Sequence, residues 1–290
     1  MRVLLASDGS SNSRRATRWL RDFALPADTR VSVLTVATLT EPSRDSQTMR
    51  ELRERAVAEA HQAAERTAKI LSGRWPAVDT LVTQGDPQVE IVRVAEDRRV
   101  DMTVLGARGL GPMKRFFVGS TSLAVARYAP SPVAIVRGRP RPVRHVLVSV
   151  DGSEGSRAAL RFLSSFELLR GTRVSLLHVL QRPDVPGLRR RVTPRPDREH
   201  DEDRRKQRAD AETVLADAAA VLADAPSPVE RLVVEGDPAQ EIVRIARRRD
   251  VDLVVLGARG LRTLGRLLLG SVSETVLHHA GRPVVIARER

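Results

Sequence analysis

The chain is an internal duplication, and this repeat limits what it can fold into. Residues 3–10, Val-Leu-Leu-Ala-Ser-Asp-Gly-Ser, match residues 146–153, Val-Leu-Val-Ser-Val-Asp-Gly-Ser, at an offset of 143 positions. Gly-Asp-Pro at residues 85–87 returns at residues 236–238, at an offset of 151. The second half therefore carries eight additional residues between the two motifs. In a chain of 290 residues, this pattern predicts two domains of one fold. The stiff Arg-Gly-Arg-Pro-Arg-Pro stretch at 137–142 predicts the boundary, with domains at residues 1–140 and 141–290.

Each half alternates strand patterns with helix patterns. In the first half, short apolar runs predict strands at residues 3–7, 31–36, 78–83, 102–105 and 133–136. Between them, capping residues and apolar periodicity predict helices at about 11–23, 45–72, 87–97 and 120–128. The second half repeats this order, except that the stretch from about 180 to 208, rich in proline and charge, predicts a loop or lid. We expect an α/β fold, with two doubly wound domains that each hold a parallel sheet covered by helices on both faces.

Two glycine-rich segments follow the fourth strand of each half. Gly106-Ala107-Arg108-Gly109 is followed by nine residues and then by Gly119-Ser120. The same spacing returns at Gly257-Ala258-Arg259-Gly260 and Gly270-Ser271. Glycines let main-chain N–H groups approach an anion, and a helix N-terminus adds unpaired donors. The segments could also be structural turns, but their repetition favours a phosphate cradle.

An aspartate ends the first strand of each half, at Asp8 and Asp151. In open parallel sheets, ligands bind beyond the carboxyl ends of the strands, where the strand order reverses. If the first and fourth strands are neighbours, Asp8 and the Gly106 segment border one crevice. The carboxylate of Asp8 could accept hydrogen bonds from a nucleobase amino group or a ribose hydroxyl, or Asp8 could simply form a turn.

The composition favours a protein that binds small anions over one that binds nucleic acid. The net charge is +13, but 46 of the 49 basic residues are arginines spread along the chain, and aromatic residues make up 3%. A nucleic-acid binder would show a clustered basic face with stacking aromatics. The absence of cysteine, of a signal peptide and of a membrane-length apolar run leads us to expect a cytoplasmic protein with no membrane contact.

Several catalytic motifs are missing. The sequence has neither a P-loop with its lysine nor a dinucleotide-binding Gly-x-Gly-x-x-Gly after a strand. It shows no metal-ligand cluster, and His178, His278 and His279 fit structural positions better than a catalytic set. We therefore expect no catalytic residues, no protein-held metal and at most a weak ATPase.

The strand-end aspartates, the Gly-Asp-Pro motifs and the repeated Gly-x-x-Gly, nine residues, Gly-Ser spacing resemble the universal stress protein family in its tandem form. The resemblance covers both halves except the stretch near 181–208. It implies a five-stranded parallel sheet in the order 3-2-1-4-5 in each half. It also implies pairing through the fifth strands, at residues 133–136 and 284–286, either within one chain or in a homodimer.

The same resemblance implies one ATP in each half, with Mg²⁺ accompanying the nucleotide. In the first half the implied contacts are Ala6, Ser7, Asp8, Val36, Leu105, Gly106, Arg108, Gly109, Gly119, Ser120, Thr121 and Ser122. In the second half they are Ser149, Val150, Asp151, Val179, Leu256, Gly257, Arg259, Gly260, Gly270, Ser271, Val272 and Ser273. The second half is nearer the family pattern, because the first has Thr121 where the family has valine and Pro112 inside its loop.

The function that follows from the resemblance is regulatory. We expect an ATP-binding stress-adaptation protein whose nucleotide alters its conformation or its choice of protein partner. The alternative is an interaction scaffold of the same fold that binds no nucleotide.

Overall fold

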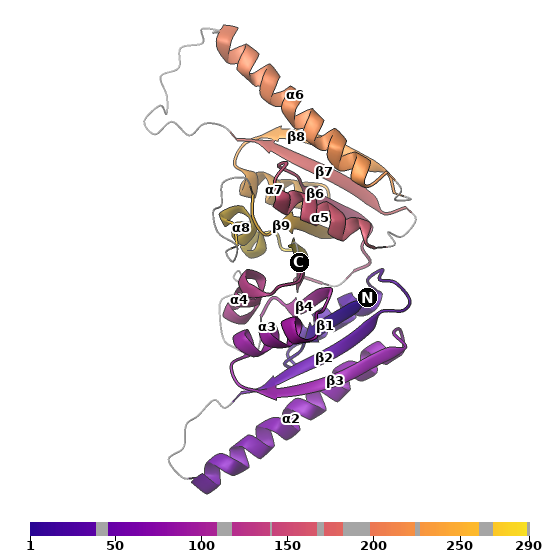
Figure 1. Ribbon diagram of the computed structural model, residues 1–290, viewed down its shortest axis with the longest axis vertical. Coiled ribbons are helices and arrows are strands. Elements are labelled where there is room, and N and C mark those ends of the chain that lie inside the picture. Colours follow the sequence, from indigo (N-terminus) through magenta and orange to yellow (C-terminus); the bar gives the residue numbers. More distant parts are fainter. Residues whose placement is uncertain are drawn as a thin grey trace.

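The computed structural model describes residues 1–38, 46–108, 118–139, 141–166, 171–181, 198–223, 227–260 and 269–288. Within these residues the two halves form similar α/β units, and the long helices of the two units lie at opposite ends of the molecule (Figure 1). The predicted α/β class is confirmed.

The first half contains five strands and four helices among its described residues. They are β1 (Arg2–Ala6), α1 (Ser11–Asp22), β2 (Arg30–Ala37), α2 (Ser46–Ser72), β3 (Ala77–Gln84), α3 (Pro87–Asp97), β4 (Met102–Gly106), α4 (Ser120–Tyr128) and β5 (Val133–Val136).

The second half repeats this order. Its elements are β6 (His145–Ser149), α5 (Glu154–Ser164), β7 (Arg173–Leu180), α6 (Arg198–Val221), β8 (Val229–Glu235), α7 (Pro238–Arg248), β9 (Leu253–Gly257), α8 (Ser271–His279) and β10 (Val284–Ala287). Residues of the two halves are called equivalent below when they differ by 143 through β2 and by 151 from α2 onward.

One ten-stranded sheet runs through both halves, in the order β3-β2-β1-β4-β5-β10-β9-β6-β7-β8. The predicted order 3-2-1-4-5 is therefore confirmed in each half. All pairs within a half are parallel, whereas β5 and β10 are antiparallel, with Ala134 opposite Val285. The predicted pairing through the fifth strands thus occurs within one chain, and a homodimer remains a prediction.

Local sequence signals fix where the helices begin. Ser10 caps α1 by accepting a hydrogen bond from Ser13 N, and Ser153 does the same for α5. Each Gly-Asp-Pro motif starts a helix, with Asp86 as N-cap and proline in the first turn. Gly85, before Asp86, has a φ of +141°, a value that residues other than glycine rarely adopt.

Two apolar layers cover the sheet, one on each face. α1, α2, α5 and α6 pack on one face, and α3, α4, α7 and α8 pack on the other. Each layer is continuous across the seam, which is the junction of β5 with β10. On the first face, Trp19, Phe23, Phe166 and Phe162 form a chain of ring contacts with centroid distances of 4.4, 5.5 and 4.4 Å. On each face of the sheet, the two halves therefore share one continuous apolar layer.

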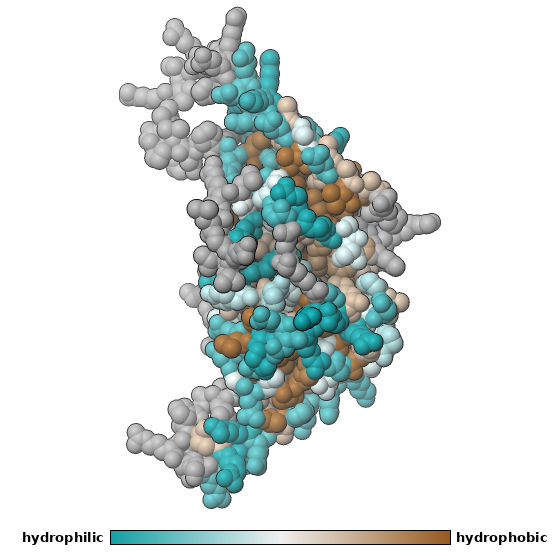
Figure 2. Space-filling view, in the orientation of Figure 1, coloured by the Kyte–Doolittle hydropathy of each residue, from teal (hydrophilic) through white to brown (hydrophobic). Residues whose placement is uncertain are grey.

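The predicted loop at about 180–208 is wrong at both ends. Leu180 belongs to β7, and α6 begins at Arg198. The run from 198 onward is rich in Arg, Glu, Asp and Lys, and the exposed side chains of residues 202–210 give α6 a hydrophilic outer surface (Figure 2). Residues 182–197 lie outside the described residues.

Candidate functional site

A cavity of about 420 Å³ opens beyond the carboxyl ends of β1, β2 and β4 in the first half. β1 is hydrogen-bonded to β2 on one side and to β4 on the other, so the strand order reverses at this point. α2, α3 and α4 complete the walls. The size lies within the range of small-molecule sites, and the place is where ligands bind in doubly wound sheets.

The cavity collects the residues that the sequence assigned to the first half. Its lining includes Ala6, Ser7, Asp8, Val36, Leu105, Gly106, Arg108, Gly119, Ser120, Thr121 and Ser122. Gly109, the remaining predicted residue of this half, lies outside the described residues.

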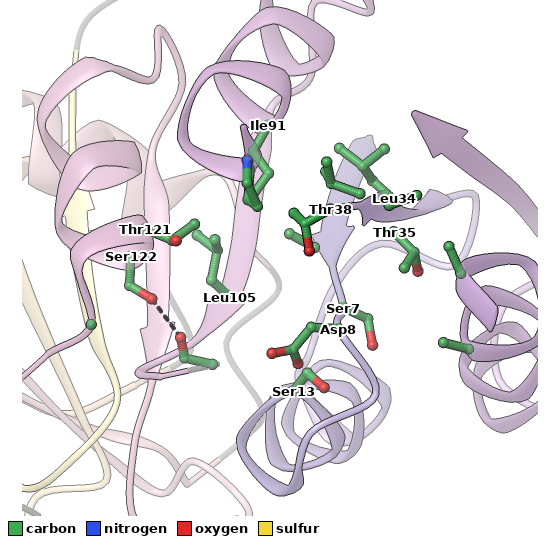
Figure 3. Close-up of a pocket in the computed structure, with 18 of the residues that line it drawn as sticks. Ser7, Asp8, Ser13, Leu34, Thr35, Thr38, Ile91, Leu105, Thr121 and Ser122 are labelled. Atoms are coloured by element: carbon green, nitrogen blue, oxygen red, sulfur yellow. Dashed lines mark hydrogen bonds between the residues drawn. The ribbon is translucent and has the colours of Figure 1, made fainter. Parts of the chain in front are cut away.

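The end of β1 holds Asp8 at the edge of this cavity. Asp8 Oδ1 accepts a hydrogen bond from Ser10 N at 3.0 Å, which closes a tight turn. Ser7 Oγ lies 3.1 Å from Thr67 Oγ1 on α2 and anchors the strand end to that helix. Figure 3 shows the Asp8 carboxylate directed into the space that separates β1 and β2 from Leu105 and Ser122. Asp8 is therefore both a turn residue and a wall of the cavity.

The opposite wall is the start of α4. Gly119 is its N-cap and offers no side-chain cap, so the first-turn N–H groups are not claimed by a capping side chain. Gly119 N donates to Ala107 O at 2.8 Å, and Ser122 Oγ donates to Gly106 O at 2.7 Å (Figure 3). These two bonds fix the helix start against the end of β4. The result is a rigid set of main-chain donors facing the cavity.

A residue of the second half supports this loop. Val118 N donates to Nδ1 of His278 on α8 at 3.2 Å, directly before Gly119. Nδ1 must be unprotonated to accept this bond. Burial lowers the pKa of His278, and Glu274 opposes that shift. The neutral imidazole is thus the form that holds the loop.

Gly106 is required for packing as well as for ligand access. A Cβ built on it would lie 2.7 Å from the carbonyl carbon and 2.8 Å from the carbonyl oxygen of Asn12 at the start of α1. No side chain fits between these two segments of backbone. The glycine therefore sets the distance between β4 and α1, which the motif alone did not reveal.

Sequence reasoning missed the outer walls of the cavity. Eleven further residues line it: Ser13, Leu34, Thr35, Ala37, Thr38, Ala56, Glu59, Ala60, Ala63, Pro87 and Ile91. Ala56, Ala60 and Ala63 form one stripe of α2, and their small size leaves room above β1 and β2. The stripe was readable in the sequence, but it looks like an ordinary helix-packing face.

The second half builds the same scaffold. Asp151 Oδ1 accepts from Ser153 N at 3.0 Å, and Gly270 N donates to Ala258 O at 2.7 Å. Ser273 Oγ donates to Gly257 O at 2.7 Å, as its equivalent does in the first half. Two halves thus share a strand-end aspartate, a glycine turn and a helix start tied by a serine.

Comparison with family models matches the family described as Universal stress protein family over residues 1–137 and again over residues 142–288. The chain belongs to the universal stress protein family. It is a tandem member, with two universal stress protein domains that meet at the seam.

Relatives of this universal stress protein include tandem and single-domain proteins. It is 29% identical to universal stress protein Rv1996 of Mycobacterium tuberculosis, over 99% of this chain and 94% of that protein. It is 28% identical to universal stress protein MJ0577 of Methanocaldococcus jannaschii, over 51% of this chain and 96% of that protein. A crystal structure of a universal stress protein from Archaeoglobus fulgidus has the same fold, with a TM-score of 0.68, 23% identity and coverage of 99% and 98% of the two chains.

In the second half, Arg259 and Gly260 lie against the start of α5 and against Asp151. Ser153 Oγ donates to Arg259 O at 3.4 Å, which brings the loop onto the start of α5. A Cβ built on Gly155 would lie 2.0 Å from that same carbonyl oxygen, and one built on Gly260 would lie 2.5 Å from Asp151 Oδ2. The main chain of the loop therefore lies directly against the aspartate. Two glycines make this closed arrangement possible.

The first half cannot adopt the same arrangement, because the residue equivalent to Gly155 is Asn12. Its Cβ would occupy the place that Arg259 O takes in the second half. Larger residues also replace small ones around the second crevice, with His178 for Thr35 and Val214 for Ala63. Val214 approaches Gly152 to 3.4 Å, measured to a Cβ built on the glycine.

The other residues predicted for the second half keep their places in the scaffold. Leu256 and Val150 are buried, Val179 and Val272 pack against the apolar layer under α7 and α8, and Ser149 ends β6. Ser271 is the first residue of α8. The structure thus places these residues near the carboxyl ends of β6, β7 and β9 and at the start of α8.

Equivalent positions in β2 and β7 each carry a buried polar atom without a hydrogen-bond partner. These atoms are Thr35 Oγ1 and His178 Nδ1. Burial lowers the pKa of His178, which keeps the ring neutral at pH 7. Thr35 lines the first cavity, and an unsatisfied hydroxyl there favours an occupant with hydrogen-bonding groups.

Two further observations concern metals and membranes. Among the described residues, no group of three or more His, Cys, Asp or Glu side chains is placed to hold a metal ion. Within the same part of the chain, none of the helices combines the length and apolar content needed to cross a membrane.

Proposed function

We propose that this universal stress protein binds an adenine nucleotide, ATP, in the crevice of its first half. The observation that carries the proposal is the cavity of about 420 Å³ with a carboxylate on one wall and a helix N-terminus on the other. A nucleotide has matching ends, because its ribose and base donate hydrogen bonds and its phosphates are anionic.

The base and ribose would lie on the side of β1 and β2. Val36, Leu105 and Ile91 supply an apolar surface for a planar ring. Asp8 has one carboxylate oxygen engaged by the turn at Ser10, and its other oxygen can accept from a hydroxyl or an amino group. Thr35 adds a hydroxyl that has no hydrogen-bond partner among the described residues.

The phosphates would lie at the start of α4. Anions bind at helix N-termini through main-chain N–H groups and the positive end of the helix dipole. Arg108 also lines this end of the cavity, and it is close enough to Arg137 to lower the pKa of that residue, although burial contributes more. An added phosphate would offset this repulsion between two guanidinium groups.

The second half fits the alternative function, that of a scaffold without nucleotide. Its loop lies against Asp151, so a nucleotide could enter only if Arg259 and Gly260 moved away from α5. We therefore propose one bound ATP per chain, in the first half, in place of the two that the sequence motifs imply.

The nucleotide is proposed to act as a regulatory ligand with at most slow hydrolysis. The charged side chains among the described lining residues are Asp8, Glu59 and Arg108. Fast phosphoryl transfer would need several positioned cations around the terminal phosphate and an oriented nucleophile. Mg²⁺ would be held mainly by the phosphates and water.

Gly119→Asp tests this proposal without disturbing the fold. A Cβ at this position would lie 3.4 Å from Arg108 Cα and 3.5 Å from Ala107 O, which is ordinary contact. Aspartate is also a favoured N-cap residue, so the helix should keep its stability. Its carboxylate would accept hydrogen bonds from the main-chain N–H groups proposed to bind phosphate, and its negative charge would repel the ligand. We expect isothermal titration calorimetry to show ATP binding lost by at least about a hundredfold.

Gly119→Ser is the matched control, because serine caps the helix without a charge and should cost less affinity. Gly270→Asp places the same carboxylate at the equivalent residue of the second half and should leave ATP binding unchanged. The proposal fails if Gly119→Asp binds ATP like the wild type, or if Gly270→Asp is the variant that loses binding.

A further inference from the structure

A second large cavity lies at the seam, beyond the ends of β9 and β10, and part of the second glycine motif, Ala258 to Gly260, lines it. Its volume is about 760 Å³. The first half contributes the C-terminal ends of α3 and α4, and the second half contributes the start of α5 with the ends of β9 and β10. The charged residues of the lining are Glu96, Arg99, Glu154, Arg259 and Arg288. Three arginines thus meet here from separate elements.

Arg288 is the most confined of these arginines. Its guanidinium donates to Ala126 O at the end of α4, while its Nε is buried and has no hydrogen-bond partner in the part of the chain that the structure describes. Burial lowers the pKa of Arg288 to about 10, and the neighbouring Arg259 contributes to this shift. A guanidinium that is buried beside a second positive charge is costly, and an anion would offset that cost.

The equivalent residue of the first half has a different environment. Arg137 donates to Leu277 O at 3.1 Å and also to His278 O, so two carbonyl oxygens at the end of α8 receive it. Arg137 does not line the seam cavity. Arg137 therefore joins the two halves at the seam, whereas the equivalent Arg288 also lines the seam cavity.

The two halves also differ at a turn that borders the seam cavity, and this difference makes the cavity more basic. Arg99 and its equivalent Asp250 both have positive φ, at 47° and 50°, so they occupy the same turn after a helix. Asp250 pairs with Arg141 at 2.9 Å and with Arg282 at 2.8 Å. The first half places a positive charge at this position, on the edge of the seam cavity.

Two carboxylates line the cavity beside the three arginines. Glu154 pairs with Arg157 and with Arg161, each at 2.9 Å, and both of these arginines lie outside the cavity lining. Glu96 lies on the exposed surface of α3. The cavity also has an apolar side, made by Ala158 with Ala129, Pro130 and the half-exposed ring of Tyr128.

We propose that the seam cavity binds an organic phosphate, with its phosphate at Arg288 and Arg259 and its apolar part against Tyr128. Guanidinium groups match phosphate oxygens in shape and charge, and aromatic rings stack on planar groups. The volume exceeds that of an inorganic anion and suits a small metabolite. Because both halves line the cavity, the ligand stabilises their docking. This site is separate from the crevice proposed for ATP.

Tyr128 provides a selective probe, since it is the single tyrosine of the chain. Protein labelled with 3-fluorotyrosine gives one ¹⁹F resonance, from the edge of the seam cavity. We expect titration with inorganic pyrophosphate, at constant ionic strength, to shift this resonance in a saturable way. Arg288→Gln and Arg99→Asp should each weaken the apparent affinity by about tenfold or more. Arg99 is exposed, so its variant tests the site even if Arg288→Gln folds poorly.

Two controls separate this site from others. Arg137→Gln removes the equivalent strand-end arginine and should leave the pyrophosphate affinity within about twofold, because Arg137 is outside the cavity. Gly119→Asp blocks the proposed ATP crevice and should also leave the ¹⁹F response intact. The inference is overturned if the shift does not saturate, if sodium sulfate or chloride reproduces it at equal ionic strength, or if Arg99→Asp binds pyrophosphate as well as wild type. It is also overturned if Gly119→Asp abolishes the response.

Discussion

A single hydroxyl in each half ties the glycine turn to the helix that follows it, and removing it tests how the cradle is held. In Ser122→Ala the donor to Gly106 O is lost from a buried site, where the bond length is 2.7 Å. A buried neutral hydrogen bond contributes about 1 kcal/mol, and the carbonyl left behind adds to the loss. We expect the free energy of unfolding to fall by about 1–2 kcal/mol and the midpoint of thermal unfolding to fall by about 2–3 °C.

Ser273→Ala is the matched variant, because Ser273 makes the same 2.7 Å bond to Gly257 O. Urea unfolding should show similar destabilisation for both variants. Calorimetry should then separate them: Ser122→Ala lets the start of α4 shift and weakens ATP binding by about tenfold, whereas Ser273→Ala leaves it unchanged. Equal effects of both substitutions on ATP affinity would refute the assignment of the nucleotide to the first half. No loss of stability in either would refute the role given to the hydroxyls.

Three other substitutions follow from the structure. Gly155→Ala should drive the loop at Arg259 away from α5, because the Cβ would lie 2.0 Å from its carbonyl oxygen; the ATP stoichiometry measured by calorimetry should rise from one toward two. Gly106→Ala should lower the free energy of unfolding by about 2–3 kcal/mol through contact with the Asn12 main chain, as measured in urea. His278 has a lowered pKa, so the unfolded chain binds its proton first, and stability is present above about pH 6.5 and lost as the pH falls below it. His278→Asn should flatten this part of the pH profile of thermal unfolding.

The strand order 3-2-1-4-5 followed from the family resemblance, whereas the repeat and the apolar runs were sufficient to predict two α/β domains with parallel strands, because strands that alternate with helices leave few topologies. They were also sufficient for the inner wall of the first cavity, since Asp8 and Gly119 belong to short motifs with fixed positions at strand and helix ends. The outer wall could not be predicted in the same way. Ala60 and Ala63 define it by being small, and the sequence does not say which side of a helix faces a void.

The difference between the two crevices also escaped the sequence, and its cause is local. Motif spacing places Gly257 and Gly270 in the second half as it places Gly106 and Gly119 in the first, and the second half is nearer the family pattern because the first has Thr121 for valine and Pro112 in its loop. Gly155 lies outside the motif, yet it decides whether the loop can close. A motif indicates which residues can contact a ligand. Whether a crevice is open to that ligand depends on how the loop packs when no ligand is bound.

The seam connects the second half to the cradle of the first half. Antiparallel pairing of β5 with β10 places α8 beside the loop of the first half, where His278 accepts from Val118 N. The ion pair of Arg127 on α4 with Glu274 on α8, at 2.7 Å, joins these two helices. The second half therefore supplies part of the support for the first-half cradle. Coupling between them requires no long pathway, because a change in α8 acts on the residue next to Gly119 directly.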